Sequence, residues 1–479
     1  MRGLLLLVTV STSFAVVVAC ATTDADAPEE PPQDVAVGLP DGGNPMDAPF
    51  DPQTDADLPA ENTCSAAGWC TTQLPDSDLT LTDIWPFEKR AFAIAETPTQ
   101  GIKVLEWEEA TNAWTYIDDG TQNDFDARRY SGTIWAPSEN EVYFGAAPSF
   151  IYHGTRATPS ATWKWTRSRL EIQRPDASTS DARDPGSARI VTGTSFVGVT
   201  TDYAALGVWG TSKDDVYAWY GNTLFHRTID GEWVPEYEAV DDVEGGDTFF
   251  FFGADGSGRD DVWFTGIRGR YAGESIFSCP IVVHKNADGY RRLVDHTPTG
   301  TLATDSRRGS CGTRAGARSI QSLDGFPPFV PMAIRDYPAR GWVTRITSVG
   351  PNAAMAIYNG SSIAYFESSD ADVAMYIPTG VRVAGTDTPY KLRSIWAHGE
   401  RVWMSGWGLA LHTPANADHW RTGAIINSPP DDSGAPTVDV STLSLNGGAL
   451  DAPIHQVRGT SNTNLWAVGA RYALHKTTP

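Results

Sequence analysis

VWGTSKDDVYAWYGNTLFHRTIDGEW, at Val208–Trp233, holds three short runs with the composition of β-strands and the beginning of a fourth. The runs are VWG, DVYAWY and TLFHRT, and polar turn residues separate them. Short runs rich in β-branched and aromatic residues between turn residues are typical of β-strands. The stretch therefore predicts one unit of four short strands.

Seven degraded copies of this unit follow one another along the chain, and each begins with a pair similar to Ile-Trp or Val-Trp. The gaps between successive markers are 50, 74, 43, 95, 49 and 62 residues. The short gaps match the period of about 40–50 residues of a four-stranded propeller blade, and the long gaps indicate blades with insertions. The second residues of the seven pairs are Trp85, Trp135, Trp209, Phe252, Thr347, Trp396 and Arg458.

Seven copies predict an all-β fold, a single seven-bladed β-propeller, because propellers have about four to eight blades. A β-sandwich is the competing all-β fold, but it does not need a motif that recurs at this period. The last copy stops near His475, before a Gly-x-Trp strand, although a ring without that strand keeps an open edge. The triplet Ala67-Gly68-Trp69 resembles the start of the fourth strand in the opening stretch. We expect a strand near residues 69–72 to close the ring, and the propeller to span 64–479.

The N-terminus has the pattern of an export signal. Arg2 precedes a mostly apolar run, Leu4–Val18, that is shorter than a comfortable transmembrane helix. Val17-Val18-Ala19-Cys20 resembles the lipobox of bacterial lipoproteins, with Val17 where that family prefers Leu. The resemblance implies cleavage after residue 19, acylation of Cys20 and attachment to a membrane. In Gram-negative lipoproteins, Ala21 after the cysteine implies sorting to the outer membrane. The alternative is an ordinary secretory signal that ends near an incidental cysteine.

Residues 20–63 predict a disordered tether between this anchor and the propeller. Ala21–Thr63 contains eleven Asp and Glu residues, no Lys or Arg, and many Pro and Gly residues. Such a segment buries too little apolar surface to offset the entropy lost on ordering. It also holds about half of the formal net charge of −23. A chain this acidic is not expected to bind nucleic acid, which needs a basic surface.

Histidine and acidic residues recur at equivalent positions of the repeats, which indicates a structural role rather than metal binding or catalysis. His153, His226, His284, His412 and His475 occupy the same slot in five copies, on the predicted third strand. One residue per blade cannot converge on one metal ion there, and the other histidines lack ligand spacing. Asp214-Asp215 and Asp260-Asp261 precede a strand, where Asp commonly bonds turn amides. No metal or cofactor is expected, and no catalytic residue can be assigned, since no Gly-x-Ser-x-Gly elbow or sialidase Asp-box is present.

Four cysteines remain after Cys20 is set aside, and an even number in an exported chain predicts two disulfides. Three pairings are open, and proximity in the sequence favours Cys64–Cys70 and Cys279–Cys311. Free thiols are the alternative. Cys279 is expected to end an insertion between strands two and three of copy four, and Cys311 to lie in the connection to copy five.

Arginines concentrate in the long connections of copies two and four. We expect these connections to share one face of the propeller, which would be a docking site for carboxylates, sulfates or an acidic partner. The alternative is solvated loops whose charge balances nearby Asp. The strongest ligand-binding candidates are Arg268, Arg270, Tyr271, Arg307, Arg308 and Arg314.

The repeat unit resembles those of secreted bacterial lipoproteins built on Ile-Trp-Gly-Ser-x-x-Asp-Val-Trp units, and it is similar to tectonin-type propeller repeats. The residues that carry this resemblance are Val208-Trp209-Gly210 and Asp215-Val216-Tyr217, with their counterparts over residues 78–479. The resemblance implies a fold, and members that bind glycans or proteins imply a binding function. We therefore expect a lipid-anchored envelope propeller that binds a glycan or protein through its Arg-rich loops. The alternatives are a polysaccharide hydrolase or lyase, or a purely structural envelope component.

Overall fold

The computed structural model describes 64–124, 130–171, 189–192, 201–240, 247–272, 275–299, 310–313, 342–369, 373–376, 381–383, 391–415, 420, 426–428 and 437–478. The chain divides into Met1–Pro59 and Ala60–Pro479, and every described residue belongs to the second unit. The predicted signal, Cys20 and the tether lie outside the described residues. Among the residues described, no helix is long and apolar enough to cross a bilayer.

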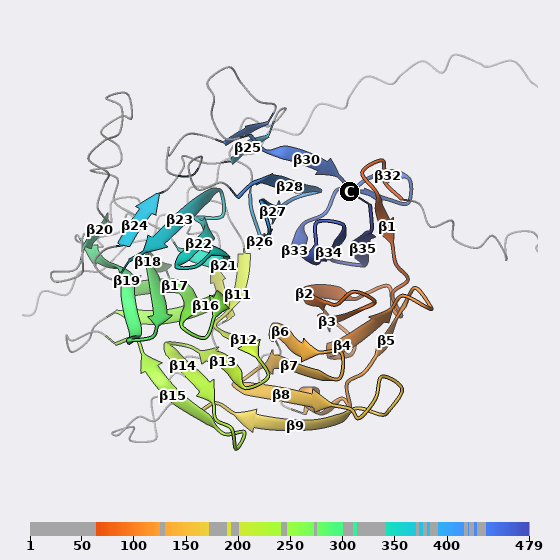
Figure 1. The fold of residues 1–479 in the computed structure, drawn as a ribbon, viewed down its shortest axis with the longest axis horizontal. Helices are drawn as coiled ribbons and strands as arrows, with labels where there is room; N and C mark the ends of the chain where they lie inside the picture. Colours follow the sequence, from red (N-terminus) through yellow and green to blue (C-terminus); the bar gives the residue numbers. More distant parts are fainter. Residues whose placement is uncertain are drawn as a thin grey trace, which may run out of the picture. The chain divides into compact units, whose positions relative to one another are not determined.

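Seven antiparallel sheets form a ring, with one sheet per blade (Figure 1). The first strand of each blade contacts the first strand of the next, and the seventh contacts the first again. The all-β, seven-bladed propeller predicted from the repeats is therefore confirmed. Three two-stranded pairs also occur: β10 (Arg189–Thr192) with β11 (Thr201–Ala204), β25 (Val381–Val383) with β29 (Ile426–Ser428), and β31 (Ser444–Leu445) with β32 (Gly448–Ala449).

Blades 1 to 3 are regular four-stranded meanders. Blade 1 is β2 (Thr80–Pro86), β3 (Arg90–Thr97), β4 (Gly101–Glu108) and β5 (Ala113–Tyr116), followed by the 3-10 turn η1 (Thr121–Asn123). Blade 2 is β6 (Ser131–Ser138), β7 (Glu141–Ala146), β8 (Phe150–Thr155) and β9 (Lys164–Arg169). Blade 3 is β12 (Leu206–Ser212), β13 (Asp215–Tyr220), β14 (Thr223–Arg227) and β15 (Trp233–Glu238).

Blades 4 to 6 vary more. Blade 4 is β16 (Thr248–Gly258), β17 (Asp261–Ala272), β18 (Ser275–Asn286) and β19 (Gly289–Thr299), with β20 (Ser310–Thr313) as a fifth strand. Blade 5 is β21 (Val343–Gly350), β22 (Ala353–Tyr358), β23 (Ser362–Ser368) and β24 (Val373–Tyr376). Blade 6 is β26 (Ser394–His398), β27 (Arg401–Ser405), β28 (Leu409–Pro414) and β30 (Asp439–Thr442).

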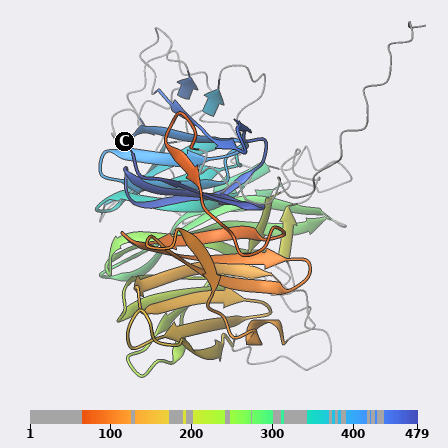
Figure 2. The ribbon, with the colours of Figure 1, turned by 90° about the vertical axis from the view of Figure 1, so that its right-hand side faces the viewer.

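Blade 7 joins the two ends of the described chain. Its first three strands are β33 (Ile454–Ser461), β34 (Asn464–Gly469) and β35 (Tyr472–Lys476), and its fourth is β1 (Trp69–Thr71). Trp69 pairs with Lys476 and Thr71 with Leu474, which places the closing strand where the sequence predicts one. Figure 2 shows β1, in orange-red, beside the blue strands of blade 7.

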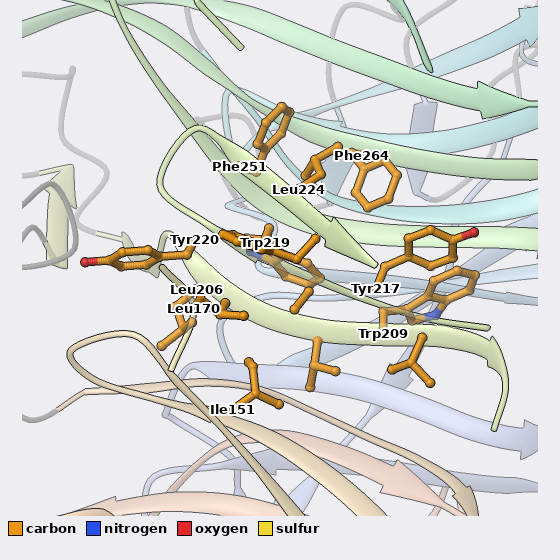
Figure 3. Packing of buried hydrophobic residues seen from close by; sticks show 14 of the residues in the cluster. Ile151, Leu170, Leu206, Trp209, Tyr217, Trp219, Tyr220, Leu224, Phe251 and Phe264 are labelled. Carbon is orange, nitrogen blue, oxygen red and sulfur yellow. The ribbon is translucent and has the colours of Figure 1, made fainter. Parts of the chain in front are cut away.

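Burial falls from the middle of each blade toward its outer edge. All six residues of the second strand β13 are buried, whereas the fourth strand β15 is mostly exposed or intermediate. A second strand lies between two strands of its own sheet and between two neighbouring blades, so both of its faces need apolar residues. Figure 3 shows the resulting core between blades 3 and 4, where Leu224 lies next to Phe251 and Phe264.

Two details differ from the sequence prediction. In blade 4 the residue equivalent to Trp209 is Asp255. Asp255 faces Trp263 of β17, just as Trp209 faces Tyr217 of β13. The sequence prediction placed this position at Phe252, three residues too early. The insertion that the sequence predicts up to Cys279 is folded as part of the hairpin, because β17 and β18 pair without interruption up to their turn.

Candidate functional site: the central channel and the looped face

The first strands line the ring axis, and among the described strands none pairs with them on their inner side. An edge strand of this kind presents unpaired N–H and C=O groups that need other partners. Cross-strand partners define equivalent positions around the axis. The tryptophan layer consists of the residues that face the third residue of each second strand: Trp85, Trp135, Trp209, Asp255, Thr347, Trp396 and Arg458.

The polar layer lies two residues earlier in each first strand and consists of Asp83, Thr133, Gly207, Gly253, Arg345, Ser394 and Gln456. Three of its side chains accept the free backbone N–H of the next blade. Asp83 Oδ2 accepts from Ile134 N at 3.1 Å, and Thr133 Oγ1 accepts from Val208 N at 2.8 Å.

Ser394 Oγ likewise accepts from Val457 N at 2.8 Å. Each such bond contributes about 0.5–1.5 kcal/mol and satisfies an otherwise unpaired edge group. The polar layer therefore joins neighbouring blades at the axis.

The tryptophan layer repeats this arrangement between blades 4, 5 and 6. Asp255 Oδ2 accepts from Ser348 N at 3.1 Å, and Thr347 Oγ1 accepts from Ala397 N at 3.0 Å. Burial raises the pKa of the Asp255 carboxyl, although Arg458 and the hydrogen bonds from Gly256 N and Ser348 N oppose the shift. The polar residues that replace tryptophan in this layer are thus links between blades.

Three polar groups at the axis are buried without a hydrogen-bond partner among the described residues. Two of them are Arg345 Nε and Gln456 Oε1. Gly207 has no side chain, and a Cβ there would lie 2.1 Å from Cζ2 of Trp219. The indole of Trp219 fills that space, and its Nε1 also has no partner. A buried polar group left unpaired costs about 1–3 kcal/mol, so these three groups mark a candidate site.

A cavity on the axis brings these groups together. It is lined by residues of all seven first strands and by Trp219, and its volume is about 20 Å³. Arg345, Gln456, Asp83 and Arg458 all belong to its lining. A space of this size holds about one ordered water or an ion of similar size.

Arg458 is held in place on one side of the cavity. Its Nη1 donates to the carbonyl of Ile84 at 3.1 Å and lies 3.7 Å from Asp83 Oδ1. The guanidinium also lies over the ring of Trp85 at 4.6 Å, which is a cation–π contact. Burial lowers the pKa of Arg458, although the carboxyls of Asp83 and Asp255 partly oppose that shift.

The second candidate site is the face that carries the connections between blades. Since neighbouring strands are antiparallel, turns between strands 2 and 3 share one face with the connections from one blade to the next. We call this the looped face. Blade 4 extends furthest there, because β17 and β18 have 12 residues each while β13 and β14 have 6 and 5.

Arg268 does not belong to an open binding surface, contrary to the sequence prediction. It is 2% exposed, its Nε donates to Asp247 Oδ2 at 2.7 Å, and its Nη1 donates to Asp295 Oδ1 at 3.0 Å. Its guanidinium also lies over the ring of Phe249 at 5.2 Å. Arg268 therefore links β17 to its neighbours inside the blade, because its position in the middle of a paired strand directs it into the core.

Arg270 is the predicted ligand-binding residue that the structure leaves partly open. Its side chain is 41% exposed, and its Nε donates to Asp247 Oδ1 at 2.6 Å. The side chain of Tyr271 and the residues Arg307, Arg308 and Arg314 lie outside the described residues.

The five histidines of the repeat slot all lie on third strands: β8, β14, β18, β28 and β35. Each packs against the aromatic residue opposite it on the second strand, with ring centroids 4.1 to 4.7 Å apart. A structural position of this kind is what the repeat predicts. In the part of the chain that the structure describes, no three His, Cys, Asp or Glu side chains are grouped to hold a metal ion.

The carboxylates of Asp215 and Asp261 bond mainly side chains, which differs from the turn-amide bonding expected from the sequence. Asp261 accepts from His284 Nε2, Trp263 Nε1 and Ser257 Oγ, and from one backbone group, Asn352 N. The reason is the strand register. The aromatic residue two positions after each Asp and the His of the third strand lie on the same face of the sheet as the Asp carboxylate, within bonding distance. The acid that begins a second strand thus ties three strands together.

The most highly charged of these networks surrounds His226 of blade 3. Its Nε2 lies 3.1 Å from Asp215 Oδ1 and its Nδ1 lies 3.0 Å from Glu236 Oε1. Hydrogen bonds to Asp215 and then Glu236 raise the pKa of His226 to about 9. Burial alone would raise the pKa of Asp215, but hydrogen bonds from His226, Thr211 and Tyr217 hold it at about 2. At neutral pH the pair is therefore an ion pair with satisfied partners, and it has no free general base.

We expect His226→Gln to destabilise the protein at pH 6 by about 1–2 kcal/mol and to have much less effect at pH 10. The folded-state pKa of His226 lies above the unfolded value of about 6.5. Its stabilisation is therefore complete below pH 6.5 and is lost as the pH rises through 9. Urea unfolding at both pH values measures the difference.

His475→Gln is the matched control, since burial lowers the pKa of His475 to about 4 and the residue is neutral throughout that pH range. Equal costs of His226→Gln at pH 6 and pH 10 would contradict the ion-pair description.

Cys64 and Cys70 form a disulfide, as the sequence predicts. Cys279 is buried and disulfide-bonded as well, and it faces Arg268 within the hairpin of blade 4. Cys311 pairs with Pro298 through its backbone, and its side chain lies outside the described residues. Both cysteines therefore lie in strands of the extended blade 4.

No protein-family model and no curated protein matches the chain. Among solved structures, it is similar to YCF48 from Cyanidioschyzon merolae, with 10% identity and a TM-score of 0.47 over 86% of this chain and 99% of that one. It is also similar to Raptor from Chaetomium thermophilum (9%, TM-score 0.46, 86% of this chain and 29% of that chain). A third similar structure is the WD40 β-propeller domain of Doa1 (8%, TM-score 0.35, 85% and 96%). These likenesses concern the fold alone.

The sequence did not lead us to predict the residues that line the axial cavity. Copy five has Arg345 and Thr347, and copy seven has Gln456 and Arg458, where other copies have smaller residues or tryptophan. These departures within the aligned repeats were a usable signal. Trp219 gave no comparable signal, because a tryptophan on a second strand is ordinary core.

Proposed function

We propose that the protein is a lipid-anchored component of the cell envelope that binds an acidic glycan or an acidic protein partner at its looped face. The anchor would be the acylated Cys20, and the outer membrane would be its location, as the resemblance of the N-terminus to a lipobox implies. Residues 21–63 would then keep the propeller away from the membrane surface.

The observation that favours a binding role is the extended hairpin of blade 4. β17 and β18 remain paired as far as Ala272 and Ser275, beyond Gly269, the residue opposite the start of β16. The fifth strand β20 adds to the same blade. Loops and hairpins on a rigid scaffold are common positions for binding residues. Arg270 lies on this hairpin, and a guanidinium can bind carboxylate or sulfate groups through paired N–H donors.

Binding is tested with the purified full-length protein and three immobilised polymers: a sulfated polysaccharide, poly-glutamate and neutral dextran. We expect binding to at least one polyanion and none to dextran. The double variant Arg307→Ala/Arg308→Ala should weaken that binding about tenfold or more, because each lost charge-assisted contact is worth about 1.5–3 kcal/mol.

Arg259→Ala is the matched control, since this side chain is 65% exposed at a turn between strands 1 and 2, on the opposite face. Failure to bind either polyanion, or undiminished binding by the double variant, would contradict the proposal. Release of a shortened glycan would instead favour the hydrolase or lyase alternative. The anchor is tested separately: palmitate should label the wild-type chain and not Cys20→Ala.

A further inference from the structure

The axial cavity contains hydrogen-bond donors that lack acceptors. Trp219 is 1% exposed, and its Nε1–H group can only donate. Arg345 Nε is buried without a partner, and a guanidinium likewise can only donate. Both residues line the same small cavity, so a single guest can accept from both.

Gln456 adds a third polar group that can adapt to the guest. It is 1% exposed and its Oε1 has no partner, because the backbone N–H of Ile84 that it could have bound is taken by Asp83 at 2.9 Å. An amide can be turned by half a revolution, which exchanges its oxygen and its NH₂ group. Gln456 can therefore present either an acceptor or a donor to the cavity.

The charge around the cavity favours an anion over a cation. Arg345 and Arg458 both line it, and Asp83 is the carboxylate in the lining. The oxygens of Asp83 already accept from Ile84 N and Ile134 N, and Arg458 lies beside them. Buried charge is unfavourable unless it is compensated, and the second guanidinium has no carboxylate partner among the described side chains.

The geometry points to a binding site for one small monovalent anion of halide size on the ring axis. We propose that Trp219 Nε1, the Arg345 guanidinium and the Gln456 amide hold it, with the amide turned to donate. The cavity volume of about 20 Å³ is enough for one guest of the size of a water molecule or a halide ion. The three groups come from blades 3, 5 and 7, so the bound ion would link blades that are not neighbours.

The direct test is a crystal of the full-length protein grown in bromide, with diffraction data collected above the bromine absorption edge. We expect an anomalous peak in the axial cavity, in contact with Trp219 Nε1 and Arg345. A cavity without such a peak, filled by water alone, would overturn the proposal.

A second measurement uses thermal unfolding in chloride or bromide against gluconate at equal ionic strength. A ligand that binds only the folded state raises the melting temperature in a concentration-dependent way. We expect a rise in halide that saturates, and none in gluconate. Equal melting temperatures in chloride and gluconate would also count against the site.

Variants assign the effect to the cavity. Arg345→Met should abolish the halide-dependent rise, and Trp219→Phe should raise the halide concentration at half-saturation about tenfold, the effect of one lost charge-assisted donor. Arg259→Met, on the outer surface, should keep the full response. If Arg345→Met does not fold, the bromide map and Trp219→Phe still decide the question. An unchanged halide response in Trp219→Phe would contradict the assignment of its donor.

Discussion

Trp69→Ala is expected to lower the free energy of unfolding by about 3–5 kcal/mol, the usual cost of truncating a buried tryptophan. Trp69 is fully buried, although it lies in a strand of three residues. Its Nε1 donates to Ser441 Oγ at 2.8 Å, and its ring meets Trp403 edge to face at 6.3 Å.

Both contacts of Trp69 belong to blade 6, whereas its backbone pairs with β35 of blade 7. One side chain at the start of the propeller thus joins the last two blades. The loss should appear as a shift of the urea midpoint without a change in slope, because the surface exposed on unfolding hardly changes.

Trp407→Ala is the matched control, since Trp407 is 54% exposed and its truncation should cost about 1 kcal/mol or less. Equal costs for Trp69→Ala and Trp407→Ala would contradict the closing role of β1.

Arg156→Met should be nearly as damaging, with a loss of about 3 kcal/mol, because it leaves a buried carboxylate with fewer partners. Arg156 lies in the turn after β8 and donates two hydrogen bonds of 2.7 Å to Glu106 of blade 1. It also donates to the carbonyl of Glu139 at 2.6 Å and lies over the ring of Trp163 at 4.4 Å. Arg90 still pairs with Glu106 in the variant, which keeps the loss below that of a fully orphaned charge.

The double variant Glu106→Gln/Arg156→Met should cost less than the two single variants added together, because no unpaired charge then remains. Arg167→Met in the same blade is the control. Arg167 is 42% exposed and lies 3.5 Å from Asp124, so its loss should cost under about 1 kcal/mol. Additive costs in the double variant would contradict a direct Arg156–Glu106 interaction.

The fold was predictable because its signal is repeated. A unit such as Val208–Trp233 cannot bury its apolar second strand alone, and seven copies supply the neighbouring blades that it needs. The closing strand was also predictable, since Ala67-Gly68-Trp69 supplies a fourth strand that the last copy lacks. The residue of blade 4 equivalent to Trp209 was placed wrongly because a run of four phenylalanines, Phe249–Phe252, hides the alternation of apolar and polar residues that fixes strand register.

The candidate sites were less predictable, because the role of a polar residue depends on what lies across the axis or across the blade. Arg268 lies in a segment whose arginine-rich composition is typical of a surface loop. The structure places it in a paired 12-residue strand, where it is buried beside Asp247 and Asp295. Arg345 and Gln456 are far apart in the sequence and meet only when the ring is closed. The composition of the sequence identified an arginine-rich region. Strand pairing and packing in the folded blade determine which of those arginines face solvent.

The central claim is that an N-terminal strand completes the seventh blade and closes the ring. Hydrogen–deuterium exchange of the full-length protein tests it most directly. The amide of Thr72 donates to the carbonyl of Ala473 at 3.0 Å, and alternation along the antiparallel pair turns the amide of Cys70 toward β35 as well, so both are protected only if β1 is paired with β35. We predict that these two amides exchange as slowly as those of β35. Rapid exchange of Cys70 and Thr72, with β33–β35 still protected, would show that the ring is not closed by this strand.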